Sequence, residues 1–122
     1  MRRLNLDNNY TAGIVAEFVA KVYLRLLCYK VLRSRYSAVR GSGAGEVDII
    51  VRRGRTIVFV EVKKRKTIDL AKEAIFLQQK QRIRKSAEAF LAKNPRYAGY
   101  DVRFDAMCFD RWFRFEYLKN AF

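Results

Sequence analysis

The stretch EVDIIVRRGRTIVFVEVK, residues 46–63, decides the fold. It contains two runs rich in β-branched and aromatic residues, 46–52 and 56–63, on either side of Arg53-Gly54. Such residues favour strands, and a glycine-containing pair between two strand-like runs is typical of a tight hairpin. The stretch therefore predicts two neighbouring antiparallel strands joined by a two-residue Arg53-Gly54 turn.

Acidic residues interrupt both runs. Successive side chains of a strand point to opposite faces, so Glu61 and Lys63 share one face of their strand and Glu46 and Asp48 share one face of theirs. With the predicted turn, Glu46 lies opposite Glu61 and Asp48 lies diagonal to it. An odd-numbered loop or a bulge would instead put Glu61 on the face opposite Asp48.

Three acids on one sheet face need a counter-charge. Like charges across a ladder are destabilising, and partly buried carboxylates are costly unless they are paired or metal-bound. Mg²⁺, or Mn²⁺ in its place, suits the cluster because such hard cations prefer oxygen ligands. Lys63 beside them can orient or deprotonate a water, or stabilise charge on phosphorus. The alternative is an ordinary Glu61–Lys63 surface pair on an edge strand, with Glu46 and Asp48 capping the loop.

The remaining elements predict a single α/β domain, residues 1–122, with a mixed central β-sheet flanked by helices in the order αβββαββ. We expect a helix over 10–27, a strand over 30–36, a loop over 40–45, a helix over 70–92, and strands over 100–109 and 112–118 around an Asp110-Arg111 turn. The first helix carries an apolar stripe, which we expect to face the core: Ile14, Val15, Phe18, Val19, Val22 and Leu26.

Composition narrows the function. The chain has no histidine, which excludes histidine bases and histidine zinc sites, and we expect both cysteines, Cys28 and Cys108, to be buried reduced thiols. No apolar run is long enough to span a bilayer and no signal peptide is recognisable, so we expect a cytoplasmic protein without a membrane partner. The net charge is +14, which favours a polyanionic partner such as nucleic acid.

Half of the charge excess lies in residues 63–85, where nine basic residues face only Asp69 and Glu73. We expect its basic residues to contact nucleic-acid phosphates, in a first group of Lys64, Arg65 and Lys66 and a second group of Lys80, Arg82, Arg84 and Lys85. Solvated helix charge is the alternative for the second group. Most aromatic residues alternate along the C-terminal hairpin as core residues, which predicts no stacking platform for single strands.

Two motifs, GEVDII at 45–50 and VFVEVK at 58–63, resemble the D…(D/E)-x-K signature of the PD-(D/E)XK nuclease superfamily. More closely, the chain resembles the YraN family of small bacterial endonuclease-like proteins, uncharacterised protein family UPF0102. The further matches are Gly13, Glu17, Ala20 and Tyr23-Leu24 on the first helix, the helix Glu73 to Leu91, and Arg103-Phe104-Asp105. Val47 stands where the superfamily has its proline.

The resemblance implies a restriction-endonuclease-like core with Mg²⁺ or Mn²⁺, hydrolysing phosphodiester bonds of DNA, including branched or junction DNA. It makes Asp48 and Glu61 metal ligands, supported by Glu46, and Lys63 the water-positioning lysine. It also implies a further carboxylate from Glu17.

On the second helix the family usually has a lysine where this chain has Gln79, which would bind substrate or water, while the lysine is displaced to Lys80. Surface-helix positions are the alternative for Glu17 and Gln79. Junction-cutting relatives act as dimers, which by analogy implies a homodimer. The rival function is a catalytically silent nucleic-acid-binding protein of the same fold.

Overall fold

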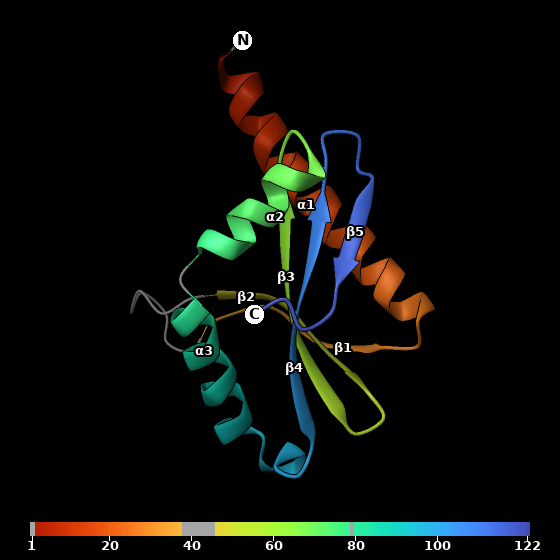
Figure 1. The fold of residues 1–122 in the computed structure, drawn as a ribbon, viewed down its shortest axis with the longest axis vertical. Coiled ribbons are helices and arrows are strands. Elements are labelled where there is room, and N and C mark those ends of the chain that lie inside the picture. The colour runs from red at the N-terminus through yellow and green to blue at the C-terminus, as the bar shows by residue number, and fades with distance from the viewer. Residues whose placement is uncertain (1, 38–45, 79) are drawn as a thin grey trace.

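The computed structural model describes residues 2–37, 46–78 and 80–122, with side chains from residue 11 onward. Within these ranges the elements follow the order α1 (Arg2–Leu26), β1 (Lys30–Ser37), β2 (Glu46–Arg53), β3 (Thr56–Lys64), α2 (Ile68–Leu77), α3 (Lys80–Lys93), the short 3₁₀ helix η1 (Pro95–Tyr97), β4 (Asp101–Phe109) and β5 (Phe115–Leu118). Figure 1 shows these elements around one twisted sheet.

The described strands form a five-stranded mixed sheet in the order β1-β2-β3-β4-β5. Neighbouring strands are antiparallel except β3 and β4, which run parallel with Glu61 beside Ala106 and Lys63 beside Cys108. Parallel neighbours need a long crossover, and α2, α3 and η1 supply it. The predicted α/β class, a mixed sheet flanked by helices, is confirmed.

The helices cover the sheet from different sides. Ala16, Ala20 and Leu24 of α1 pack with Ile49 and Val60 of the sheet. Ile83, Ala87 and Phe90 of α3 pack with Val47, Ile50, Ile57 and Phe59. Because neighbouring residues such as Ile49 and Ile50 of β2 fall in different groups, α1 and α3 lie on opposite faces of the sheet (Figure 1). α2 packs through Ala71 and Ile75 against Ala106 and Cys108 of β4.

The β2–β3 turn differs from its predicted position. Arg53 pairs with Thr56, so the two-residue loop is Gly54-Arg55 and not Arg53-Gly54. Gly54 has φ +60, the left-handed conformation that the first loop position of a type II′ hairpin requires and that glycine adopts at little cost. The glycine therefore fixes the turn, and every pairing moves by two residues while the parity of the loop is kept.

The face of α1 also differs from the prediction. The residues of α1 that reach the core are mostly small, Ala16 and Ala20 among them, whereas Phe18 is 63% exposed and Leu26 is 77% exposed. Ile14, Val15 and Val22 of the predicted stripe are also exposed, and Val19 is partly buried. A helix that lies close to a sheet needs small residues at the contact, and this requirement outweighs side-chain hydrophobicity here.

The helix predicted over 70–92 is two helices, with the chain extended at Gln78. No glycine or proline lies between them; α2 and α3 separate because they pack on different parts of the sheet. Accordingly Ile75, Ile83 and Phe90 are buried as predicted, but Phe76 is 71% exposed. The predicted loop 40–45 and the predicted site residue Gln79 lie outside the described residues.

Two further predictions are corrected near the chain's cysteines and its last hairpin. Cys28 is exposed just after α1, and only Cys108 is buried. β5 begins at Phe115 rather than Trp112, so residues 110–114 form a longer loop between β4 and β5. Within the described residues, no helix is long and apolar enough to cross a membrane.

Candidate active site

The site forms where β2 and β3 separate. Their ladder ends at the pair Ile49–Val60, and one more step in the same register would set Asp48 opposite Glu61. Instead the Asp48 side chain enters the gap, where its Oδ2 accepts a hydrogen bond of 2.7 Å from the Val62 amide. A carboxylate thus occupies the place of a main-chain acceptor at the point where the sheet opens.

Glu61 lies next to this opening and is 7% exposed. Its Oε2 is 3.7 Å from the Lys63 Nζ, and its Oε1 is buried without a hydrogen-bond partner among the described residues. Burial and the neighbouring Asp48 carboxyl raise the pKa of Glu61 to about 9, against the opposing influence of Lys63. Neutral Glu61 is therefore the favoured form unless another positive charge joins the site.

The three acids predicted on one face do not all share it. Val47 packs with Ile50 on the α3 side while Ile49 packs on the α1 side, so the alternation of β2 is broken at Asp48. Glu46 and Asp48 line a cavity of about 360 Å³ on the α1 side, together with Val62 and Lys64. Glu61 follows Ile57 and Phe59 toward the α2 and α3 side. The irregularity of β2, the exception recognised in the sequence, turns Asp48 to the α1 side, yet its carboxyl stays close enough to Glu61 to raise the pKa of Glu61.

Glu17 lines the same cavity as Asp48, from α1. Its carboxylate accepts from Arg35 Nε at 3.2 Å and lies 3.9 Å from Lys21 Nζ. Arg35 has φ +53, which is uncommon for a residue with a side chain. Glu17 is therefore a paired acid close to the candidate site, while Glu46 at its rim is exposed.

The residues that would hold a divalent cation are Asp48 and Glu61. Within the described residues no group of three or more histidine, cysteine, aspartate or glutamate side chains lies close enough to hold a metal ion. Mg²⁺, however, binds through one or two carboxylates and keeps waters and phosphate oxygens as its other ligands. Asp48 and Glu61 supply two carboxylates, and the unpartnered Glu61 Oε1 is a buried oxygen that a cation would satisfy.

The first basic group continues β3 beyond Lys63. Lys64 lines the Asp48 cavity, and its Nζ lies 4.9 Å from the centroid of the Phe113 ring. Arg65 and Lys66 are exposed in the connection to α2.

Three of the four residues of the second basic group lie around one cavity. Lys80, Arg82 and Lys85 line a cavity of about 380 Å³ at the start of α3. Arg84 is also exposed but lies over the Phe104 ring instead, 5.0 Å from its centroid.

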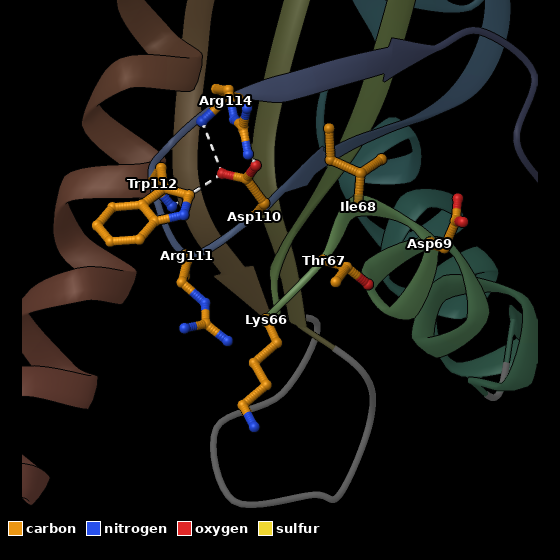
Figure 2. A pocket seen from close by; sticks show the side chains of 8 residues that line it. All are labelled: Lys66, Thr67, Ile68, Asp69, Asp110, Arg111, Trp112 and Arg114. Carbon is orange, nitrogen blue, oxygen red and sulfur yellow. Dashed lines mark hydrogen bonds and ion pairs between the residues drawn. The ribbon is translucent and has the colours of Figure 1, made fainter.

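Two features near the site were not predicted. Trp112 is 69% exposed in the β4–β5 loop, beside Lys66 and Arg111 (Figure 2). It was expected as the first residue of a strand, but Asp110 Oδ1 accepts from the amides of Trp112 and Arg114 and so extends the predicted turn through residue 114. The second feature is Gln78, whose buried Nε2 has no partner among the described residues.

Residues 16–109 match the model of the uncharacterised protein family UPF0102. A UPF0102 protein of Paramagnetospirillum magneticum is 48% identical over 100 residues, which cover 82% of this chain and 78% of that protein. A UPF0102 protein of Methylorubrum extorquens is 45% identical over 112 residues, covering 90% and 83%. One from Azorhizobium caulinodans is 36% identical over 113 residues, covering 93% and 83%. The matched range includes Glu17, Asp48, Glu61 and Lys63.

Proposed function

The chain belongs to the uncharacterised protein family UPF0102, and from the geometry around Glu61 we propose that it is a metal-dependent nuclease that hydrolyses phosphodiester bonds of DNA. The observation that carries the proposal is the buried Glu61 carboxyl, with one oxygen unpartnered among the described residues and the Asp48 carboxyl beside it. Asp48 also serves the sheet as an acceptor, but no described residue satisfies Glu61 Oε1. A cation that binds both carboxylates would compensate their charge and satisfy the buried oxygen.

Asp48 and Glu61 would hold Mg²⁺ or Mn²⁺, which supplies Lewis-acid activation of a phosphate oxygen and of water. Lys63 stands 3.7 Å from Glu61 and is 26% exposed, so its ammonium can reach a phosphate as well as the acid. There it orients the attacking water and stabilises the charge that builds on phosphorus. Water adds to phosphorus, the P–O bond to the leaving oxygen breaks, and that oxygen takes up a proton.

The surrounding charge supports a nucleic acid as the substrate. The net charge is +14, and Lys64, Arg65 and Lys66 follow directly after Lys63. Phosphate contacts from such residues provide affinity that is independent of sequence. The same proposal includes a PD-(D/E)XK type of site, a preference for branched or junction DNA and a homodimeric state, because the motifs resemble those of junction-cutting nucleases. It also includes action in the cytoplasm, as the sequence leads us to expect.

The test is cleavage of branched, duplex and single-stranded DNA with Mg²⁺, Mn²⁺ or EDTA. We expect cleavage with either metal, none in EDTA, and a loss of at least about 100-fold in Glu61→Gln and Lys63→Met. Glu88→Gln and Lys93→Met remove matching charges from exposed positions of α3 and should retain activity. Calorimetry should find Mn²⁺ uptake in the wild type and in Glu88→Gln but not in Glu61→Gln.

Other outcomes point elsewhere. Cleavage that survives Glu61→Gln would come from a different site or protein. Salt-sensitive DNA binding by all variants without cleavage under any metal would favour the second candidate, a catalytically silent nucleic-acid-binding protein. The exposed basic residues Lys66, Arg82 and Lys85 favour that candidate equally, because phosphate binding needs no acids.

A further inference from the structure

A cavity of about 490 Å³ lies between the β3–α2 connection and the β4–β5 loop, apart from the two cavities described above. Trp112, the only tryptophan of the chain, stands at its edge and is 69% exposed. Its ring offers a flat, apolar face with a polar N–H beside the cavity, which suits stacking of a planar ligand. The volume lies within the range of small-molecule sites and can accept one nucleobase.

The loop holds Trp112 in place. Asp110 Oδ1 accepts hydrogen bonds from the backbone amides of Trp112, at 2.8 Å, and Arg114, at 3.0 Å. The Phe113 amide donates to the Asp110 carbonyl oxygen at 3.1 Å, and Phe113 has φ +64. The backbone on both sides of the indole is therefore fixed. When a ligand stacks on Trp112, the loop loses little conformational freedom, so binding costs little entropy.

The charges around the cavity favour an anion near the indole. Lys66 and Arg111 are exposed, and Figure 2 shows their side chains extending to the same side, away from Asp110. The Arg111 guanidinium lies 6.0 Å from the centroid of the Trp112 ring. Asp110 is neutralised by Arg114 at 2.8 Å, and Asp69 lies across the cavity from Trp112 (Figure 2).

Lys64 contacts both the cavity of Asp48 and the loop that carries Trp112. Lys64 lines the cavity of Asp48 on one side, and its ammonium lies over the ring of Phe113, the residue next to Trp112. Basic residues thus lead from the acids to the indole without a break in the chain: Lys63, Lys64, Arg65 and Lys66.

From these contacts we infer that the Trp112 cavity binds an unpaired nucleotide of a nucleic-acid strand, with its base stacked on the indole and its phosphates at Lys66 and Arg111. This inference rests on the proposed function, since it describes how the same substrate extends beyond the cleaved bond. The occupant is single-stranded because the faces of bases inside a duplex are already stacked on one another. A substrate with unpaired nucleotides beside the cut is therefore preferred over a continuous duplex.

The experiment uses the emission of Trp112, which is free of other tryptophan signals in this chain. In EDTA, which prevents cleavage, the full-length protein is titrated with a short oligothymidylate, with an abasic strand carrying the same number of phosphates, and with a blunt duplex. Anisotropy of labelled strands measures binding independently. We expect oligothymidylate to quench the emission, and the abasic strand and the duplex to bind without quenching.

Variants separate stacking from charge. Trp112→Ala should weaken oligothymidylate binding roughly tenfold and leave abasic binding unchanged. Phe18→Ala removes an aromatic side chain of similar exposure from α1 and should leave both affinities unchanged. Arg111→Gln should weaken binding of both strands, whereas Arg96→Gln, at an exposed position of η1, should not.

The outcomes keep this inference distinct from the nuclease proposal. Unchanged emission at saturating oligothymidylate, full affinity in Trp112→Ala, or equal quenching by the duplex would each overturn the inference, even if Glu61-dependent cleavage is found. Quenching with a tenfold loss in Trp112→Ala, but no cleavage under any metal, would support the inference and reject the nuclease.

Discussion

The carboxyl group of Glu61 is buried beside Asp48, and this raises its pKa from the ordinary value of 4.5 to about 9. A folded state that holds a proton more tightly than the unfolded chain is most stable at low pH. Its stability is complete below the ordinary pKa of the acid and falls as the pH rises toward the pKa of the folded state. In this protein the fall should occur between about pH 4.5 and pH 9.

Glu61→Gln should therefore stabilise the metal-free protein at alkaline pH. The amide cannot ionise, so at pH 9 its free energy of unfolding should exceed that of the wild type by several kcal/mol, since each pKa unit corresponds to about 1.4 kcal/mol, with little difference at pH 5. Urea denaturation in EDTA at several pH values measures this. Glu88→Gln, at an exposed position, is the control; parallel pH profiles for wild type and Glu61→Gln would contradict the prediction.

The two cysteines should react at very different rates. Cys28 is exposed after α1, whereas Cys108 is fully buried in β4, and burial raises the pKa of the Cys108 thiol to about 11. Because the thiolate is the reactive form, only Cys28 should react promptly with a disulfide reagent at pH 8 in the native protein. Cys28→Ser should abolish the fast phase. Unfolding this variant in denaturant should expose Cys108 and make one thiol reactive. A fast phase in Cys28→Ser would show that Cys108 is accessible.

At the scale of elements, the more hydrophobic face of α1 is exposed to solvent and its less hydrophobic face packs on the sheet. The large apolar residues Phe18 and Leu26 are exposed, while Ala16 and Ala20 contact the sheet. The space at Ala20 is therefore limited, and the space at Phe18 is open to solvent.

Ala20→Leu should destabilise the protein by about 1–3 kcal/mol, because extra methylene groups in a packed contact force the helix away from the sheet. Phe18→Ser should change stability by less than about 0.5 kcal/mol, although it removes far more apolar surface. Thermal or urea unfolding of both variants measures the difference. A larger loss in Phe18→Ser than in Ala20→Leu would mean that another surface covers this face.

These elements also show how far the sequence predicts the fold. Strand residues alternate with period two and lie in short runs, so β2 and β3 could be located, together with the pairing of Glu61 and Lys63. Tertiary packing decided what periodicity could not: the buried face of α1, the break at Gln78 and the shift of the hairpin by two residues. The broken alternation at Asp48 is of this kind, because no local pattern marks where two strands separate.

At the scale of the whole molecule, Asp105 joins distant parts of the chain. It is fully buried in β4 and accepts hydrogen bonds from the Arg103 side chain, the Tyr117 hydroxyl and the Asn120 amide. Arg103 in turn donates to the Tyr29 hydroxyl at 2.7 Å. The start of β1, β4, β5 and the C-terminal residues are thus held by one buried carboxylate.

Asp105→Ala should lower the free energy of unfolding by about 3 kcal/mol, since it leaves the Arg103 guanidinium without its counter-charge and the Tyr117 hydroxyl and Asn120 amide without an acceptor. Asp101→Ala, at an exposed position of the same strand, should have little effect. Urea denaturation compares the two. Equal stability of both variants would mean that water replaces the carboxylate, contrary to its full burial.

The carboxylate that ends the β2–β3 ladder has a consequence for the history of the family. Asp48 accepts from the Val62 amide and so serves the sheet itself, whereas the buried Oε1 of Glu61 has no hydrogen-bond partner among the described residues. Under the proposed function, a relative that binds no cation would retain an acceptor at position 48 but would gain stability from an apolar residue at position 61. Glutamate at position 61, rather than aspartate at position 48, is therefore the residue whose presence should follow metal binding among relatives.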